Sequence, residues 1–335
     1  MLRPEDGCDR GQLLVIIALV LGIVFVALAI VVNAAIFTQN LATRETVDSE
    51  RTAAFTGDVE RAIEVRYNQT NSNGSRTASA ARTTFDDTFR GWTDQRSNVS
   101  ATEGGFFDAT WTTHVGWRLN QSSDDSFAPV DAPAATDWIV VENTRNVSTL
   151  RLDVTREHLY NGSTLGDVES DAFRVNVSDG STDWELYVLN DSADDEVVVF
   201  QGDPSTYGSY SGLVDDGCSV NADRTVIDFL TMKVNAKECP DLAFEDDLSG
   251  PVTISYENVN VSDEERINGT YTVVVNGSDA LATNNSDYPE RFNVTGSGEP
   301  AAHAVVYAVD YTTTYERADV EHHRDGRYAP RAELY

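Results

Sequence analysis

Lysine is almost absent from this chain. Its 335 residues include only Lys233 and Lys237, so arginine supplies nearly all of the positive charge, and the formal net charge is −31. A surface this acidic repels phosphates, which argues against nucleic acid as a partner. Molar salt shortens the Debye length to about 3 Å and screens such self-repulsion, so the composition predicts a protein of an extreme halophile that folds in high salt.

The common catalytic and ligand-binding motifs are also missing. There is no Cys-X-X-Cys or His-X-X-X-His pair for zinc, no Gly-X-Ser-X-Gly nucleophile elbow and no Gly-rich phosphate loop. The acidic runs 191–196 and 215–216 lack the glycine at the sixth position of a calcium loop. The segment 321–325 (EHHRD) resembles a solvated charged strand end more than a metal site. We therefore expect no catalysis, no cofactor and no metal.

One apolar run, Gln12–Val32, contains no charged residue. At 1.5 Å rise per residue, about 20 such residues cross a hydrocarbon core of about 30 Å. The run is longer than the 7–15 apolar residues of a usual cleaved secretory signal. It predicts a single-pass transmembrane helix over 12–37, preceded by a cytoplasmic leader or tail over 1–11.

Acceptor sequences for N-glycosylation are unusually dense after this run. Asn-X-Ser/Thr occurs thirteen times among twenty-one asparagines, whereas chance would give about four. None of them precedes the apolar run, which predicts an N-terminus inside the cell and a glycosylated C-terminal domain outside. The predicted acceptors are Asn68, Asn73, Asn98, Asn120, Asn146, Asn161, Asn176, Asn190, Asn260, Asn268, Asn276, Asn284 and Asn293.

The three cysteines fit the same orientation. Cys8 precedes the apolar run, whereas Cys218 and Cys239 follow it and have only each other as partners outside the cell. We predict a Cys218–Cys239 disulfide that closes a loop of about 20 residues. The alternative is two buried free thiols.

The remaining pattern predicts an α+β fold. Apolar residues at helical spacing continue past the membrane helix, which indicates an amphipathic helical stalk over 38–95. Gly57 suggests a bend in it, a second helix is expected over 77–92, and a loop is expected from Ser97 to Gly105. From 105 to 335 the apolar period changes to two, as at 107–119, 252–256, 271–275 and 305–315, with turns predicted at Asp179-Gly180 and Asp325-Gly326. Many short strands of this kind favour a mainly antiparallel β-sandwich ectodomain.

The junction Asp9-Arg10-Gly11-Gln12, followed by Leu13-Leu-Val-Ile-Ile, resembles the class III signal of archaeal type IV pilin-like proteins. The first 45 residues are similar to those of uncharacterised haloarchaeal surface proteins of this sort. The resemblance implies cleavage between Gly11 and Gln12 on the inner side of the membrane. It also implies that the retained apolar helix packs against other pilin-like subunits.

These features predict a membrane-anchored, pilin-like surface protein with a structural, assembly or adhesion role. The alternative from another class is a single-pass extracellular binding or sensory domain that never enters a filament. An extracellular hydrolase is a third and weaker hypothesis, since it needs a pair of Asp or Glu side chains in a cleft that the sequence does not reveal.

Overall fold

The computed structural model describes residues 8–72, 74–244, 248–261, 266–276, 291–294, 298–317 and 320–329, without the side chains of 8–13, 36–54 and 320. The chain divides into two compact units, Met1–Glu60 and Arg61–Tyr335, and each is described by itself.

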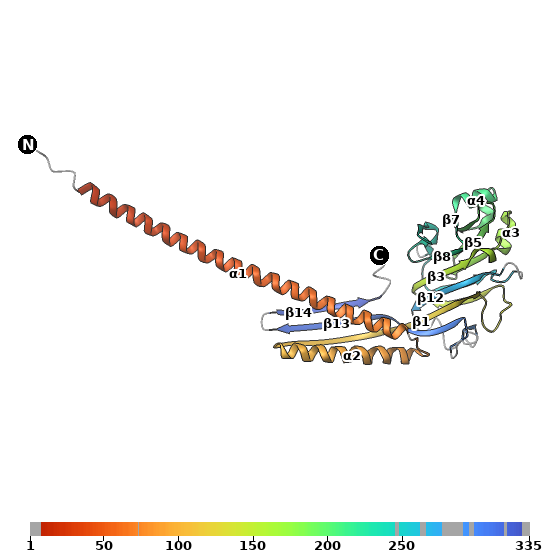
Figure 1. The fold of residues 1–335 in the computed structure, drawn as a ribbon, viewed down its shortest axis with the longest axis horizontal. Helices are drawn as coiled ribbons and strands as arrows, with labels where there is room; N and C mark the ends of the chain where they lie inside the picture. The colour runs from red at the N-terminus through yellow and green to blue at the C-terminus, as the bar shows by residue number, and fades with distance from the viewer. Residues whose placement is uncertain are drawn as a thin grey trace, which may run out of the picture. The chain divides into compact units, whose positions relative to one another are not determined.

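A single helix, α1 (Cys8–Ser72), forms the described part of the first unit and ends in the second (Figure 1). The segment Leu14–Ala35 is built from Leu, Ile, Val and Ala with one Phe, one Gly and one Asn and has no proline, so no residue in it interrupts the helical hydrogen bonds. The backbone remains helical at Gly57, where the sequence suggested a bend. This segment is the one candidate membrane span in the described part of the chain.

The second unit contains a long second helix, α2 (Ala78–Thr102). The Thr77 hydroxyl caps it by accepting a hydrogen bond from the Ala80 amide at 3.2 Å. Ala81, Phe85 and Phe89 are fully buried at the expected helical spacing. The helix extends past the predicted loop start at Ser97, because the carbonyls near its end stay bonded until the backbone turns at Gly104 (φ +75°).

Three long strands form a ribbon beside this helix: β1 (Gly105–Ser126), β13 (Ala301–Arg317) and β14 (Val320–Tyr328). All pair antiparallel, in the order β1-β13-β14. Trp111 lies edge-on to Phe89 of α2 with ring centroids 4.9 Å apart, and both Trp111 and Thr113 donate hydrogen bonds to Asp86. Alternate residues therefore face α2, while their neighbours form an open, polar face.

Two antiparallel sheets complete the unit, one of them a half-barrel. The ribbon belongs to an eight-stranded sheet of order β10-β9-β8-β3-β12-β1-β13-β14. Its other strands are β3 (Val147–Thr155), β8 (Arg224–Asp228), β9 (Lys233–Val234), β10 (Lys237–Glu238) and β12 (Asn268–Asn276).

The six-stranded sheet has the order β2-β11-β4-β5-β6-β7. Its strands are β2 (Trp138–Thr144), β4 (Phe173–Ser178), β5 (Asp183–Asp191), β6 (Glu196–Gln201), β7 (Cys218–Val220) and β11 (Val252–Glu257). Short helices connect the strands: η1 (Arg156–His158), α3 (Leu165–Asp171), η2 (Pro204–Thr206), α4 (Tyr210–Asp216) and η3 (Pro240–Leu242).

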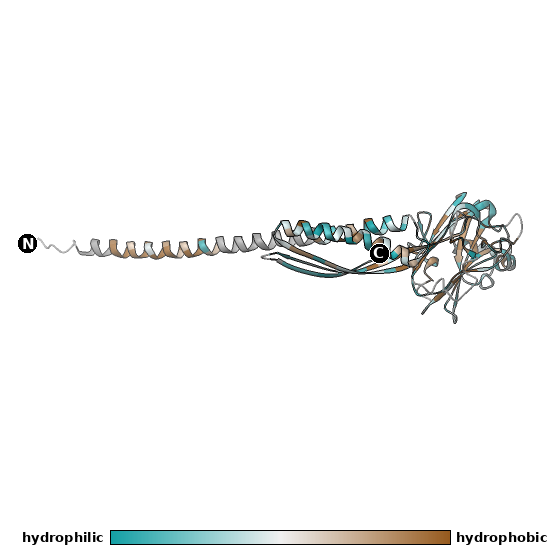
Figure 2. Cartoon of the chain, turned by 90° about the horizontal axis from the view of Figure 1, so that it is seen from below, coloured by the Kyte–Doolittle hydropathy of each residue, from teal (hydrophilic) through white to brown (hydrophobic). Residues whose placement is uncertain are grey.

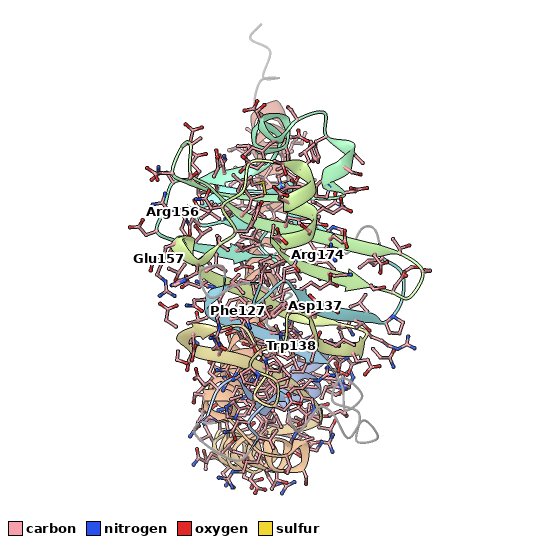
Figure 3. All side chains as sticks on the ribbon, turned by 90° about the vertical axis from the view of Figure 1, so that its right-hand side faces the viewer. Phe127, Asp137, Trp138, Arg156, Glu157 and Arg174 are labelled. Carbon is pink, nitrogen blue, oxygen red and sulfur yellow. A yellow bond between two sulfur atoms is a disulfide. The ribbon has the colours of Figure 1, made fainter. Side chains whose placement is uncertain are left out.

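Both sheets contribute to one apolar core. Alternation along β12 and β11 buries Tyr271 and Tyr256, whose rings meet edge-on at 5.4 Å. Phe127 and Trp138 lie near the middle of the end-on view in Figure 3, and the Trp138 indole donates to the Phe127 carbonyl at 2.8 Å. A smaller apolar cluster on the six-stranded sheet, around Tyr187, includes residues of α3 and α4.

The predicted disulfide is confirmed: Cys218 and Cys239 are bonded. Cys218 begins β7, an edge strand of the six-stranded sheet, and Cys239 directly follows β10, an edge strand of the eight-stranded sheet. The bond therefore joins the two sheets at one edge, a placement that the spacing of 21 residues did not reveal.

The predicted hairpin around Asp179-Gly180 is present as β4 and β5, with the Asp179 carboxylate accepting the Ser181 and Thr182 amides. The prediction of a turn at Asp325-Gly326 was wrong, since both residues lie inside β14. Gly326 serves another purpose there: a Cβ on it would clash with the Tyr311 ring, which occupies that space.

Candidate functional site

The apolar segment Leu14–Ala35 is the first candidate. Its described side chains are exposed throughout, and none of its hydropathic window is buried. Figure 2 shows it as a predominantly brown stretch of α1. By length and composition it is suited to cross a membrane, as an anchor or a signal sequence would be. The predicted cleavage residues Gly11 and Gln12 lie within the helical backbone just before it.

A junction forms where α1 ends in the second unit. The Asn71 side chain bonds to Val306 of β13 twice, donating to its carbonyl and accepting from its amide, each at 2.8 Å. Arg118 of β1 donates to the Asn71 carbonyl at 3.0 Å, and this carbonyl at the helix end also accepts the Gly74 amide at 3.3 Å. Ser75 then pairs with Ala304 as an isolated antiparallel bridge.

Burial shifts the pKa of two groups around this junction. It raises the pKa of Tyr67, which packs edge-on against Tyr328 at 5.4 Å. Burial, and then the nearby Arg118 charge, lower the pKa of His303. Nothing in the sequence indicates the junction, because Asn71 lies in the polar stretch 68–76 (NQTNSNGSR) and does not differ in type from its neighbours.

A second polar cluster spans the outer side of the six-stranded sheet, where Glu257, Arg174 and Tyr187 face one another across β11, β4 and β5. Arg174, labelled in Figure 3, pairs with Glu257 and donates to the Tyr187 hydroxyl at 3.0 Å. Burial raises the pKa of Tyr187 to about 12. Burial alone lowers the pKa of Arg174, but its bonds to Tyr187 and Glu257 outweigh that effect and raise it. Arg174, Glu257 and Tyr187 satisfy one another, and the cluster suits a structural role.

The histidine and acidic candidates do not converge. His114 pairs with Asp310 at 2.6 Å on the open face of the ribbon. The strand alternation of β14 separates His322 from Glu321, His323 and Asp325, which lie on the opposite face. In the part of the chain that the structure describes, no three His, Cys, Asp or Glu side chains group as metal ligands.

A hollow of about 510 Å³ lies over the ribbon. Most of its lining consists of open-face side chains of β1, β13 and β14: Thr110, Thr112, Asp310, Thr312 and Asp325. The Thr312 hydroxyl donates to the Asp325 carboxylate at 2.6 Å. The surface is polar and shallow, which suits contact with another hydrated surface better than enclosure of a small molecule.

The thirteen predicted glycan acceptors fall into three groups. Exposed in the folded unit are Asn68, Asn98, Asn146 and Asn161. Half-buried are Asn120, Asn176, Asn190, Asn260, Asn268, Asn276 and Asn293. Outside the described residues are Asn73 and Asn284.

The chain matches no family model, no curated protein and no solved structure. Its own sequence, fold and surface chemistry are therefore the guides to its role.

Proposed function

We propose that the chain is a type IV pilin-like, membrane-anchored surface protein of a halophilic archaeon, with a structural, assembly or adhesion role and no catalytic step. The N-terminus lies inside the cell and the second unit outside. The resemblance of residues 9–17 to a class III signal and the acidic, lysine-poor composition support this proposal.

One observation carries the proposal: the 22-residue segment Leu14–Ala35, apolar except for Asn33, stays exposed, although the second unit has a full apolar core of its own. Exposing so much apolar surface to water is costly, at roughly 25 cal/mol per Å². The segment therefore requires a partner outside this chain, and lipid or the matching helices of other subunits provide one.

The disulfide supports the outside placement of the second unit. Disulfides persist in oxidising, extracellular settings and are rare in the reducing cytosol. The Cys218–Cys239 bond lies in the unit that follows the apolar segment, which agrees with the orientation inferred from the sequons.

A processing experiment tests the proposal. Gly11→Leu puts a bulky residue at the cut, so the uncut chain keeps the charges of residues 3–10 beside its apolar helix. Burying these charges in a filament is costly. The variant is expected in the membrane fraction and absent from a sheared surface fraction. Gly7→Leu, a bulky change at another leader glycine, is the matched control and is expected in the sheared surface fraction in the same amount as the unchanged protein. Equal amounts of both variants in the sheared fraction would contradict the proposal.

An anchored binding or sensory domain remains the second proposal, and the polar hollow over the ribbon favours it. In that case neither glycine variant changes the surface amount. Both chains then begin at Met1 or Leu2.

A further inference from the structure

An N-glycan acceptor in a folded protein must satisfy three conditions. The asparagine amide must be exposed, the hydroxyl two residues later must be exposed, and the intervening backbone must be free of helix and sheet bonds, as on a surface loop. The described sequons meet these conditions to very different degrees.

Four of the half-buried asparagines fail the first condition, because part of the side-chain amide group is buried. Asn176 donates through its amide nitrogen to Glu257 at 3.2 Å, inside the Arg174 cluster. The side-chain oxygens of Asn120, Asn176, Asn190 and Asn268 are buried. A sugar on Asn176 replaces one of the amide hydrogens beside Glu257 and adds a bulky hydrated group there. It therefore opposes the contact between Asn176 on β4 and Glu257 on β11.

Three of the four exposed asparagines fail the second condition. The hydroxyl residues that follow them, Thr70, Ser100 and Ser148, are only 3%, 4% and 8% exposed. Asn68 and Asn98 also lie inside α1 and α2. The carbonyl of Asn146 accepts the Asn276 amide at 2.9 Å, so its backbone is tied to the neighbouring strand.

Asn161 meets all three conditions. Asn161 and Ser163 are both exposed, and Asn161–Ser163 lies in neither a helix nor a strand. No backbone hydrogen bond ties these three residues to other described residues.

Contacts of Tyr160 and Thr164, the residues on either side of this loop, fix its two ends. Before it, the buried Tyr160 accepts the Asn190 amide at 2.9 Å, and its ring fills the space that a Cβ on Gly162 would need. After it, the Thr164 hydroxyl caps α3 by accepting the Asp167 amide at 3.3 Å. The loop is thus a fixed, accessible projection between η1 and α3.

We propose that Asn161 carries an N-linked oligosaccharide and that the other described sequons with buried amides or hydroxyls remain unmodified. In the transfer, the Asn161 side-chain nitrogen bonds to the anomeric carbon of an oligosaccharide held on a phosphate donor. The bond from that carbon to the phosphate oxygen breaks, the amide proton passes to a base, and nothing is oxidised or reduced. The inference rests on the outside placement of the second unit in the proposed function.

Glycopeptide mass mapping of the full chain, purified from membranes of the cells that make it, tests this site. Asn161→Gln and Ser163→Ala are both expected to remove the whole glycan mass from the peptide, whereas Ser163→Thr retains it. Asn98→Gln is the matched control. Asn98 is exposed on α2, but Ser100, the hydroxyl residue of its sequon, is buried, so this variant is expected to leave the glycan pattern unchanged.

A bare Asn161, or a glycan on Asn176 or on another described sequon with a buried amide or hydroxyl, would overturn the inference. Protease treatment of intact cells tests the outside placement separately. A second unit that is digested from outside but has no sugar on Asn161 contradicts this inference alone. A second unit protected from protease contradicts the proposed function.

Discussion

The attachment of the last turn of α1 to β13 depends on one side chain. The pairing of β1 with β13 shifts register between His114 and Val115, and next to that bulge the Val306 amide and carbonyl bond to Asn71. The Val306 side chain is fully buried, so few other partners are at hand. Asn71 thus replaces a missing strand neighbour.

Asn71→Ala removes both bonds. Each is worth about 1 kcal/mol net, and leaving a buried backbone group unsatisfied adds roughly 1–3 kcal/mol, so we expect a loss of about 3–5 kcal/mol in the free energy of unfolding. For a unit of this size that corresponds to a fall in Tm of about 6–20 °C. Asn71→Asp keeps the acceptor for the Val306 amide and should lose about half as much.

A thermal melt followed by circular dichroism, in high salt, measures these losses. Ser72→Ala is the matched control, because its hydroxyl donates only to the Gln69 carbonyl in the exposed helix end, and a change within about 0.5 kcal/mol is expected. If Asn71→Ala melts at the same temperature as Ser72→Ala, the junction contributes nothing measurable and the reasoning is refuted.

Three further perturbations follow from charge, covalent linkage and protonation. A net charge of −31 predicts a much higher Tm in ~3 M than in ~0.1 M KCl, and equal melts would contradict the high-salt interpretation. Replacing both Cys218 and Cys239 by Ala should cost about 3 kcal/mol through the lost loop constraint, and a loss below about 1 kcal/mol in the same melt would contradict that estimate. Since the pKa of His303 is lowered, the unfolded chain binds the extra proton first, so stability should fall as pH drops below about 6.5. His303→Gln should flatten the plot of stability against pH below about 6.5. An unchanged slope in this variant would show that other groups cause the pH dependence.

Local patterns predicted much of the second unit. Alternation located β1, β11, β12 and β13, and the Asp179-Gly180 turn identified the β4–β5 hairpin, because side-chain period and turn chemistry are local properties. The cysteine pair was predictable by elimination.

Long-range pairing was not predictable in the same way. Nothing local indicates that β3 lies between β8 and β12, or that Asn71 meets a residue 235 positions away. The error at Gly326 has the same origin: glycine after aspartate resembles a turn, but the deciding contact is the Tyr311 ring on the neighbouring strand. For the sequons, the sequence shows where each Asn-X-Ser/Thr lies but not which hydroxyls the fold buries.

The N-terminal sequence of the membrane-bound protein tests the central proposal most directly. Because residues 9–17 resemble a signal that is cut before the apolar helix, the mature chain is predicted to begin at Gln12 and to keep Leu14–Ala35 in the membrane. A surface-exposed, membrane-bound chain that still begins at Met1 or Leu2 would contradict the pilin-like account.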